Sequence, residues 1–217
     1  MKRKQTDTIK NTTSLGESKK IVLLGDGGIG KTTLFEKLRH IKDEEYRFNK
    51  SYNATDNFDF DRIKIQTDSG YAMIDLWDTA GQENRGGKLR DAYLKGADAI
   101  LLLYDISKPE TVKNIPKWFQ QINQVAPKIP VAVIGNKADL LSELQQCECV
   151  KLRECNLQRD LGHSKVKNFL VSIKEDTHIE STTSYWSGSV THTEKPNCLI
   201  GLEYLMSQLY DKTVKLA

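Results

Sequence analysis

Eight consecutive residues near the start of the chain have the pattern of a loop that binds phosphate groups. The pattern is G-x-x-x-x-G-K-[ST], and the residues are Gly25, Asp26, Gly27, Gly28, Ile29, Gly30, Lys31 and Thr32, followed by Thr33. Glycines let backbone N–H groups turn inward around phosphate oxygens. Lys31 would reach the β- and γ-phosphates, and the Thr32 hydroxyl would bind magnesium. The alternative, a glycine-rich turn with a chance lysine, is disfavoured because a strand precedes the loop and a helix follows it.

A second polar stretch, Asp78-Thr79-Ala80-Gly81-Gln82-Glu83, follows another predicted strand. A carboxylate at a strand end beside the phosphate loop can hold magnesium through water, which is the role expected of Asp78. Gly81 leaves its N–H free to meet a γ-phosphate, and Gln82 could orient the attacking water. An ordinary polar loop explains this hexapeptide less well.

A third stretch, Asn136-Lys137-Ala138-Asp139, predicts which base is bound. An aspartate can accept two hydrogen bonds from the ring nitrogen and the exocyclic amine of guanine. Adenine would present a mismatched edge and leave a buried carboxylate without its donors, which is costly. A helix cap at a strand end is the alternative. The helix-cap alternative is disfavoured because the two phosphate-binding motifs precede this stretch in the chain.

The elements around these motifs alternate between strands and helices. Short apolar runs at 21–24, 99–104 and 131–134 are typical of strands that are covered on both faces. Alternating residues at 58–67 and 71–77 predict a hairpin, and helical spacing predicts helices at 31–40, 112–125 and 199–210. With a last short strand at 169–171, the order predicts an open, mostly parallel sheet of six strands with helices on both faces. Ligands of such sheets bind beyond the carboxyl ends of the strands, where all three motifs fall.

Two further stretches look added to this plan. Residues 140–168 are charged and partly helical, and residues 175–196 are rich in Ser and Thr with little apolar content. The second stretch is expected to form a surface loop or a ragged hairpin. The predicted organisation is a disordered tail over 1–18, one domain over 19–211 that carries both insertions, and a tail over 212–217.

The three motifs, in this order and spacing, resemble the Ras superfamily of small GTPases. Within it the chain is most similar to the Ran branch, with the Rab branch second. Three passages carry the likeness to Ran. They are GDGGIGKTT (25–33), WDTAGQE (77–83) together with GG (86–87) and LRD (89–91), and KNIPKW (113–118). The resemblance implies a three-layer P-loop G domain that binds GTP or GDP with magnesium and hydrolyses GTP slowly.

The resemblance also implies roles for residues between and after the motifs. Phe48 should pack on the guanine, Tyr52 should lie over the phosphates, and Thr55 should close on magnesium and the γ-phosphate. Ser172-Ile173-Lys174 stands where the family has S-A-K, a loop whose backbone N–H meets the guanine carbonyl. The expected catalytic residues are Gln82, Lys31 and Thr55, and the expected magnesium ligands are Thr32, Thr55 and Asp78.

Other positions depart from the family. Asp56-Asn57 follows Thr55 where the family usually has an apolar residue and then glycine, on the surface that meets effectors. The acidic C-terminal extension of Ran is absent. No cysteine follows Cys198, so the prenylated ending of Rab, Rho and Ras proteins is missing, and no glycine follows Met1 for myristoylation. These features predict no stable membrane anchor.

Composition limits the remaining possibilities. Among 217 residues the charged fraction is 28% and the net charge is +3, which is too small a surplus to argue for nucleic acid. Cys147, Cys149 and Cys155, with His163 beyond, fit no common zinc spacing, so reduced intracellular thiols are expected. The basic start, Met1 to Lys4, is interpreted as a solvated tail rather than an import or lipid-binding patch.

The expected function is therefore a monomeric, regulatory GTPase of the cytoplasm and the nucleus. Its expected partners are an exchange factor, a GTPase-activating protein, effectors and, by the likeness to Ran, nuclear transport receptors. A Rab-like trafficking GTPase without an anchor is the nearest alternative. A guanine-nucleotide-binding module without turnover is a second, motivated by Asp56-Asn57. An ATP-dependent kinase or ATPase is disfavoured by Asn136 and Asp139.

Overall fold

The computed structural model describes residues 13–41, 58–68, 70–79, 92–142, 166–183, 190–210 and 215–216. Its centre is one twisted sheet of eight strands in the order β2-β3-β1-β4-β5-β6-β7-β8. The strands are β1 (Lys19–Leu24), β2 (Phe58–Thr67), β3 (Gly70–Thr79), β4 (Ala99–Asp105), β5 (Val131–Asn136), β6 (Val166–Ser172), β7 (Thr177–Thr183) and β8 (Val190–Pro196).

The inner strands run parallel and the outer ones antiparallel. β1 pairs in parallel with β3 and β4, and β5 pairs in parallel with β4 and β6. β2 pairs antiparallel with β3 over ten residue pairs, as the predicted hairpin requires. Every residue of β4 and β5 is buried, because helices cover both faces of these strands.

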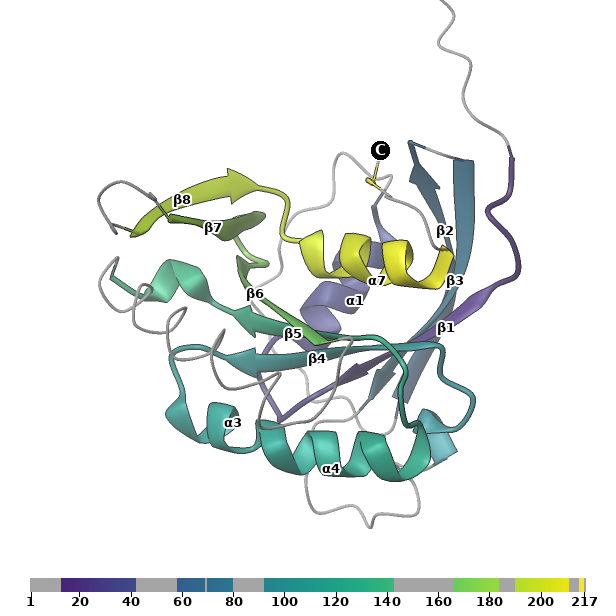
Figure 1. Cartoon of the computed structure of the whole chain (residues 1–217), viewed down its shortest axis with the longest axis horizontal. Coiled ribbons are helices and arrows are strands. Elements are labelled where there is room, and N and C mark those ends of the chain that lie inside the picture. Colours follow the sequence, from purple (N-terminus) through teal and green to yellow (C-terminus); the bar gives the residue numbers. More distant parts are fainter. Residues whose placement is uncertain are drawn as a thin grey trace, which may run out of the picture.

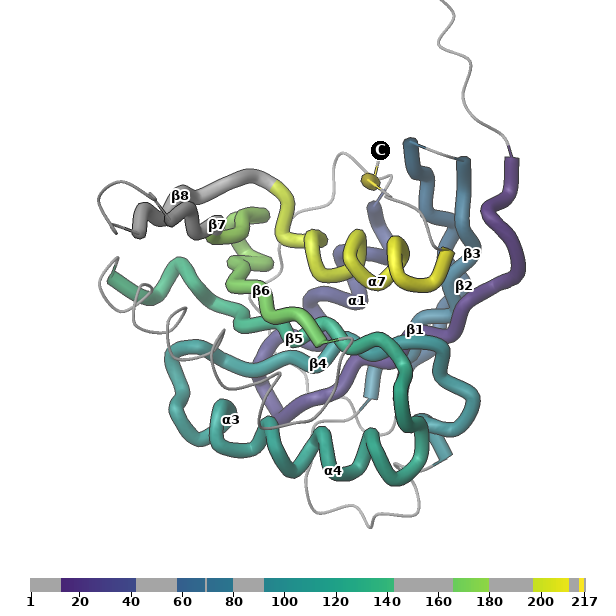
Figure 2. The backbone as a smooth tube through the Cα atoms, in the orientation of Figure 1, coloured from purple at the N-terminus to yellow at the C-terminus, as the bar shows by residue number. Residues whose placement is uncertain are grey.

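Helices lie on both faces of the sheet, which makes three layers (Figures 1 and 2). α1 (Lys31–Arg39) and α7 (Ile200–Tyr210) lie on one face, and α3 (Pro109–Lys113) and α4 (Ile115–Val125) on the other. A single 3-10 turn, η1 (Ala138–Leu140), follows β5. The α/β fold class with a mostly parallel sheet is therefore confirmed.

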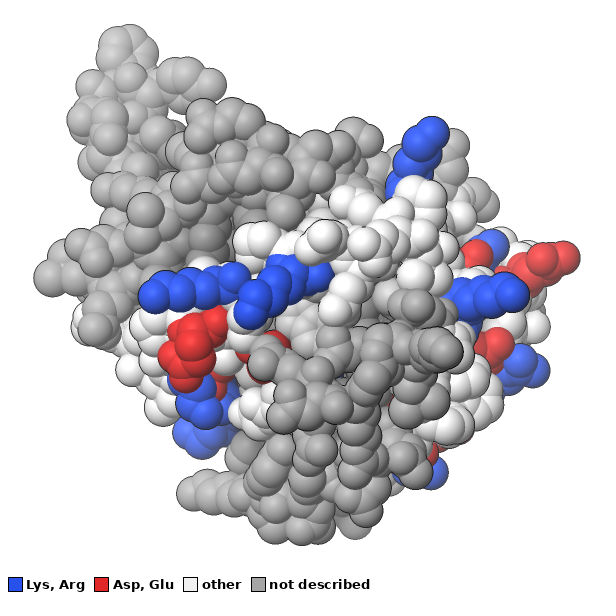
Figure 3. Space-filling model, turned by 90° about the horizontal axis from the view of Figure 1, so that it is seen from below, with Lys and Arg blue, Asp and Glu red and all other residues white. Residues whose placement is uncertain are grey.

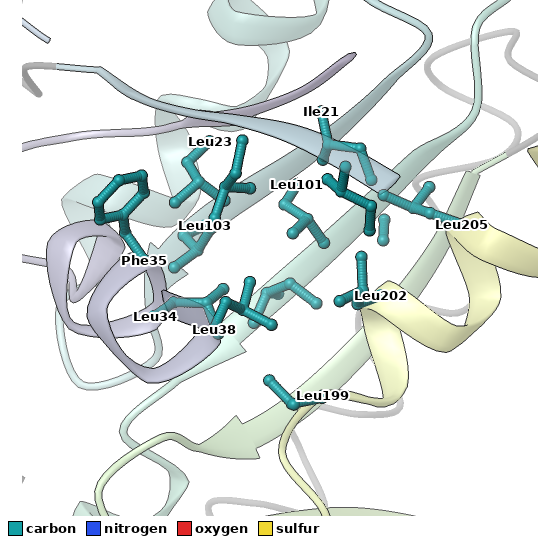
Figure 4. Close-up of a cluster of buried hydrophobic side chains, with 14 of the residues drawn as sticks. Ile21, Leu23, Leu34, Phe35, Leu38, Leu101, Leu103, Leu199, Leu202 and Leu205 are labelled. Atoms are coloured by element: carbon teal, nitrogen blue, oxygen red, sulfur yellow. The ribbon is translucent and has the colours of Figure 1, made fainter. Parts of the chain in front are cut away.

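Two apolar layers hold the helices to the sheet. Figure 4 shows one of them, where Ile21, Leu23, Leu101 and Leu103 of β1 and β4 point toward Leu34, Phe35 and Leu38 of α1 and Leu202 and Leu205 of α7. The second layer packs α4 on the opposite face through Trp118, Phe119 and Ile122, which are at most 5% exposed. Burial of apolar surface in both layers holds the strand ends at fixed positions.

The prediction of six strands is corrected to eight. Residues within 175–196 form the regular antiparallel hairpin β7–β8, with seven residue pairs from Thr177↔Pro196 to Thr183↔Val190. β7 joins the sheet through Val171↔His178 and Ser172↔Thr177 of β6. Of the two expectations for this stretch, the hairpin holds and the surface loop does not. Threonine is a β-branched residue that favours strands, so a threonine-rich segment can form a hairpin even when it carries little apolar surface.

The predicted helix over 112–125 is divided into α3 and α4 at Asn114. Pro116 has no backbone N–H and restricts the residue before it, so the chain begins a new helix there. The predicted insertion over 140–168 lies mainly outside the described residues.

Both ends of the described chain lie against the turn between β2 and β3. Leu15 N–H donates to the Tyr71 carbonyl at 2.8 Å, and Tyr71 N–H donates to the Thr13 carbonyl at 3.0 Å. On the other side of the turn, Asp68 N–H donates to the Lys215 carbonyl at 3.1 Å, and Thr67 pairs with Leu216. These contacts lie at the end of the sheet away from the phosphate loop.

Candidate functional site

The phosphate loop connects β1 to α1 and depends on glycine at its two ends. Gly25 has φ +129, and a Cβ there would stand 2.2 Å from the backbone oxygen of Leu103. Gly30, at the N-terminus of α1, has φ +105, a conformation that residues with a side chain rarely adopt. The glycines therefore let the loop pass close to β4 and turn directly into the helix.

Lys31 folds back over this loop. Its Nζ donates to the carbonyls of Gly25 at 2.9 Å and Asp26 at 2.7 Å, and the residue is 5% exposed. Burial lowers the pKa of Lys31 from 10.5 to about 8, while the nearby carboxylates of Asp78 and Asp26 oppose that shift. A phosphate group above the loop would supply the negative charge that favours the ammonium form.

Thr32 and Asp78 bring oxygen atoms together beside the loop. The Thr32 hydroxyl donates to Asp78 Oδ2 at 2.6 Å, and Asp78 is fully buried at the end of β3. A hydroxyl and a carboxylate are ligands that suit Mg²⁺, which binds one or two carboxylates together with substrate phosphates and water. The pair therefore fits the magnesium site expected for Thr32 and Asp78, where bound Mg²⁺ would neutralise phosphate charge.

Asn136, at the end of β5, connects the phosphate loop to the loop after β6. Its Nδ2 donates to the Ile29 carbonyl at 2.9 Å, and its Oδ1 accepts from Ile173 N–H at 3.1 Å. Asn136 is 4% exposed, and Ile29 is fully buried. Three loops at the carboxyl ends of β1, β5 and β6 are thus held together by one side chain.

Lys137 strengthens the same connection. Its backbone is left-handed, with φ +70, and its Nζ donates to the Gly28 carbonyl at 3.0 Å. The same ammonium lies 2.7 Å from Oδ2 of Asp105, a fully buried carboxylate at the end of β4. Although burial alone would raise it, hydrogen bonds from Lys137 and Ser107 hold the pKa of Asp105 below 3.8.

Asp139 is held by the loop after β6. The Ser172 hydroxyl donates to Asp139 Oδ1 at 2.6 Å, and Lys174 Nζ lies 3.8 Å from Oδ2. Ile173 places its side chain in the core, where it is 3% exposed, so the isoleucine that replaces the family's alanine does not fill the surface of the site. The backbone N–H of Ile173 meets Asn136, and its predicted contact with a guanine carbonyl stays a prediction.

The structure therefore brings most of the predicted site together at one end of the sheet. The described residues there are Asp26, Gly27, Gly28, Ile29, Gly30, Lys31, Thr32, Thr33, Asp78, Asn136, Lys137, Asp139, Ser172, Ile173 and Lys174. Phe48, Tyr52, Thr55, Gly81 and Gln82 lie outside the described residues, as do Cys147, Cys149 and Cys155. The fourth cysteine, Cys198, is buried.

Sequence reasoning missed several residues that support this site. Asp105 anchors Lys137, and the Thr79 hydroxyl donates to the Leu23 carbonyl at 2.7 Å, which ties β3 to β1 beside Asp78. Asn114 and Trp118 bind the Asp26 carboxylate. Trp118 lies on the buried side of its helix, and nothing in helical spacing signals that its indole N–H reaches another loop.

A parallel α/β sheet with a glycine-rich phosphate loop, an oxygen pair beside it and a polar loop after β5 defines a nucleotide-binding protein. Residues 20–190 match the Ras family. This match covers well over half of the chain, so the protein belongs to the Ras family, whose members are small GTPases that bind GTP as molecular switches. Binding of guanine nucleotide, and dependence on regulators and effectors, follow from this membership.

The described residues hold neither a clustered metal site of His, Cys and acidic side chains nor a membrane-spanning helix. No group of three or more His, Cys, Asp or Glu side chains gathers there as a metal site. Within the same residues, no helix has the length and apolar character needed to span a membrane.

Proposed function

We propose that this protein binds GTP and GDP with magnesium, hydrolyses GTP slowly, and changes conformation when the γ-phosphate is lost. The observation that carries the proposal is the position of Asn136 between the phosphate loop and the loops at 136–139 and 172–174, which we call the base loops. Its Nδ2 lies 2.9 Å from the Ile29 carbonyl oxygen, and its Oδ1 lies 3.1 Å from the Ile173 backbone nitrogen. One rigid unit would then hold both the phosphates and the base. Positioning and electrostatic stabilisation are the main needs of phosphoryl transfer.

Each part of the site has a proposed role in hydrolysis. Lys31, magnesium on Thr32 and Asp78, and the loop N–H groups would stabilise negative charge on the phosphates. Gln82 would orient the attacking water, and Thr55 would close on magnesium and the γ-phosphate. Gly27 is exposed and carries no side chain, so an arginine from an activating partner has room beside the γ-phosphate.

Single-turnover hydrolysis of bound GTP tests this proposal. Wild-type protein should convert GTP to GDP slowly, and Gln82→Leu should bind GTP as tightly but hydrolyse it more than about tenfold more slowly, because leucine cannot orient water. Lys31→Ala should instead weaken nucleotide binding. Equal hydrolysis by wild type and Gln82→Leu would remove Gln82 from the mechanism. Tight GTP binding without any turnover would favour the binding module that has lost catalysis.

Within the family, the proposal places this protein in the Ran branch, with a role in nucleocytoplasmic transport and a location in cytoplasm and nucleus. Two of the stretches that carry the likeness meet in space: Asp26 lies in the first, and Asn114 and Trp118 lie in KNIPKW. A Rab-like trafficking GTPase is the alternative. Association of Gln82→Leu, loaded with GTP, with purified nuclear transport receptors would support the Ran branch. No association in either nucleotide state would favour the alternative.

Exposed aromatic side chains support the expectation of protein partners. Phe58 and Phe60 on β2 are 46% and 43% exposed, and both rings lie against Trp77 of β3 at centroid distances of 5.4 Å and 5.1 Å. Their face of the hairpin is the one opposite Ile63 and Ile65, which point into the core. Exposed aromatic clusters of this kind mark protein-binding surfaces. We propose that effectors contact this surface.

Direct binding of nucleic acid is not part of the proposal. On the face shown in Figure 3, described Lys and Arg side chains stand next to Asp and Glu side chains. Such mixed charge does not make the continuous basic surface that phosphate backbones attract. The resemblance to Ran also supports action as a monomer.

A further inference from the structure

Asp26, the second residue of the phosphate loop, points its carboxylate away from the loop and toward the start of α4. Oδ2 accepts a hydrogen bond from Asn114 Nδ2 at 2.9 Å, and Oδ1 accepts one from Trp118 Nε1 at 2.9 Å. Asp26 is 9% exposed and Trp118 is 5% exposed. Two neutral donors from one helix start therefore hold both oxygens of a largely buried carboxylate.

The partners of Asp26 are themselves held by other contacts. Trp118 belongs to the apolar layer that packs α4 on the sheet, together with Phe119 and Ile122. Asn114 stands at the junction between α3 and α4, where its own N–H donates to the Glu110 carbonyl. Hydrogen bonds from such anchored donors to an ionised acceptor are short and about twice as strong as those between neutral groups.

The backbone of Asp26 acts on the phosphate-binding lysine. Its carbonyl accepts from Lys31 Nζ at 2.7 Å, the shorter of the two bonds that locate the ammonium. The neighbouring residues Gly25 and Gly27 have no side chains, so the Asp26 carboxylate is the side-chain anchor at this end of the loop. A shift of Asp26 would displace this carbonyl, and with it the position of the Lys31 ammonium.

We propose that Asp26 is a positioning residue for the phosphate groups of the nucleotide, and that it acts through Asn114 and Trp118. Its carboxylate holds the loop in the conformation that presents backbone N–H groups and Lys31 to the β-phosphate. The inference rests on the proposed function, because it deepens the account of the same site. It predicts that nucleotide retention depends on a hydrogen-bonded pair on the far side of the loop from the nucleotide.

The complementarity of donors and acceptors gives a sharp test. In Asp26→Asn the amide has one acceptor and one donor, so either a partner N–H faces another donor or the Asn114 amide turns over and gives up its contact with Lys117 Nζ. In Asn114→Asp two carboxylates meet at the present 2.9 Å contact. The double variant restores the match, because the new amide at position 26 can donate to the new carboxylate at position 114 and still accept from Trp118.

Release of a fluorescent GDP analogue from magnesium-loaded protein is the measurement. Each single variant should release GDP about ten- to a hundredfold faster than wild type, and the double variant should return to within about threefold of wild type. Asn123→Asp, which makes the same change at an exposed position of α4, is the matched control and should release GDP at the wild-type rate. Effects that simply add in the double variant would overturn the inference.

A comparison of nucleotides separates positioning from a general loss of structure. GMP lacks the β-phosphate. Asp26→Asn should therefore weaken GDP binding by about ten- to a hundredfold and leave the much weaker GMP binding unchanged, as measured by competition. Trp118→Phe keeps an aromatic ring in the core and removes the N–H donor. It should likewise weaken GDP binding and leave GMP binding unchanged. Equal weakening of GDP and GMP would overturn the inference, as would unchanged GDP release in folded Asp26→Asn. A wild-type protein that does not bind GDP would instead overturn the proposed function itself.

Discussion

At the scale of single residues, we propose that Asp139 carries the choice of base. Ser172 holds Oδ1 at 2.6 Å, and this contact fixes the direction of the carboxylate at the edge of the site. A carboxylate directed in this way offers acceptors to the donor edge of guanine and leaves them unmatched with adenine.

We expect Asp139→Asn to shift binding from guanine toward xanthine nucleotides, because the amide can donate where the carboxylate accepted. A site built to hydrogen-bond one base strongly rejects a base that leaves those groups unmatched, so the preference should change by at least about a hundredfold. Competition of GDP and XDP for the bound fluorescent nucleotide measures it. An unchanged preference for guanine would show that another residue reads the base.

Asp105 makes the stability of the site depend on pH. Its folded-state pKa lies below 3.8 because Lys137 and Ser107 favour the ionised form. A carboxylate with a lowered folded-state pKa contributes stability above its unfolded-state pKa, and this contribution is lost as pH falls through the folded-state value. The window for Asp105 therefore begins at pH 3.8 and extends downward.

We expect Asp105→Asn to lower the free energy of unfolding by about 1.5–3 kcal/mol at neutral pH, where a hydrogen bond to a charged group is lost. The difference from wild type should shrink as pH falls below 3.8 and through the folded-state pKa. Urea unfolding from about pH 5 downward measures it. Asp75→Asn, which removes the partner of the largely exposed Arg62, is the control and should cost at most about 1 kcal/mol. A constant difference at all pH values would contradict the assignment.

At the scale of elements, the turn from β1 into the phosphate loop depends on how closely the backbone passes β4. A Cβ on Gly25 would meet the Leu103 carbonyl oxygen at 2.2 Å, while a Cβ on Gly28 would meet nothing within 4 Å. Both glycines have positive φ, at +129 and +70. The two positions therefore separate steric conflict from backbone strain.

We expect Gly28→Ala to destabilise the protein by about 1–2 kcal/mol, which is the cost of a left-handed backbone. Gly25→Ala should cost about 3 kcal/mol or more, because the strand or the loop must also move. Thermal and urea unfolding of the two variants side by side would measure the difference. Equal costs would mean that the approach to Leu103 is not rigid.

The proposed conformational change on loss of the γ-phosphate also belongs to the scale of elements, because it involves two whole segments of the chain. Segments 48–59 and 81–95, which contain Thr55 and Gly81, lie mostly outside the described residues. They are the segments that a γ-phosphate would hold, whereas Asn136 and Ile173 hold the base loops through contacts within the protein.

We expect hydrogen exchange of 48–59 and 81–95 to be slower with a non-hydrolysable GTP analogue than with GDP. Exchange of the loops at 136–139 and 172–174 should be the same in both states and serves as the internal control. If each of the four segments exchanges at the same rate with the GTP analogue as with GDP, the protein is a static binding module.

At the scale of the whole molecule, the hairpin β7–β8 extends a sheet whose inner strands already build the site. It joins β6 through only two residue pairs, at the end of the sheet opposite β2. The contacts that hold the site loops to one another run between β1, β3, β4, β5 and the loop after β6. The outer part of the hairpin is therefore an addition to the nucleotide-binding unit.

We expect replacement of residues 182–191 by an Asn-Gly turn to leave GDP affinity within about threefold of wild type, because Ser181↔His192 can close a two-residue hairpin. Nucleotide titration and circular dichroism would check binding and fold. Loss of GDP binding in a folded variant would show that the hairpin contributes to the site.

Local sequence patterns predicted the parts of this molecule whose causes are themselves local. Continuous apolar runs identified β1, β4 and β5, alternation identified the β2–β3 hairpin, and helical spacing identified α1 and α7. The motifs at 25–32, 78–83 and 136–139 predicted where phosphate, magnesium and base would bind, because each must follow a strand in one layer. The alternation at β2 was less informative: Phe58 and Phe60 face the surface, while Ile63 and Ile65 face the core.

Only the tertiary structure decided what depends on partners distant in the chain. It extended the sheet to eight strands, divided the predicted helix over 112–125 at Asn114, and brought Trp118 to a carboxylate 92 positions away. Periodicity reports which face of a helix is buried, because burial averages over many neighbours. A single hydrogen bond depends on one donor and one acceptor at about 2.9 Å, and spacing along the chain carries no information about that distance. The sequence by itself therefore determined the class of protein and its three motifs, and tertiary packing determined how those motifs are held together.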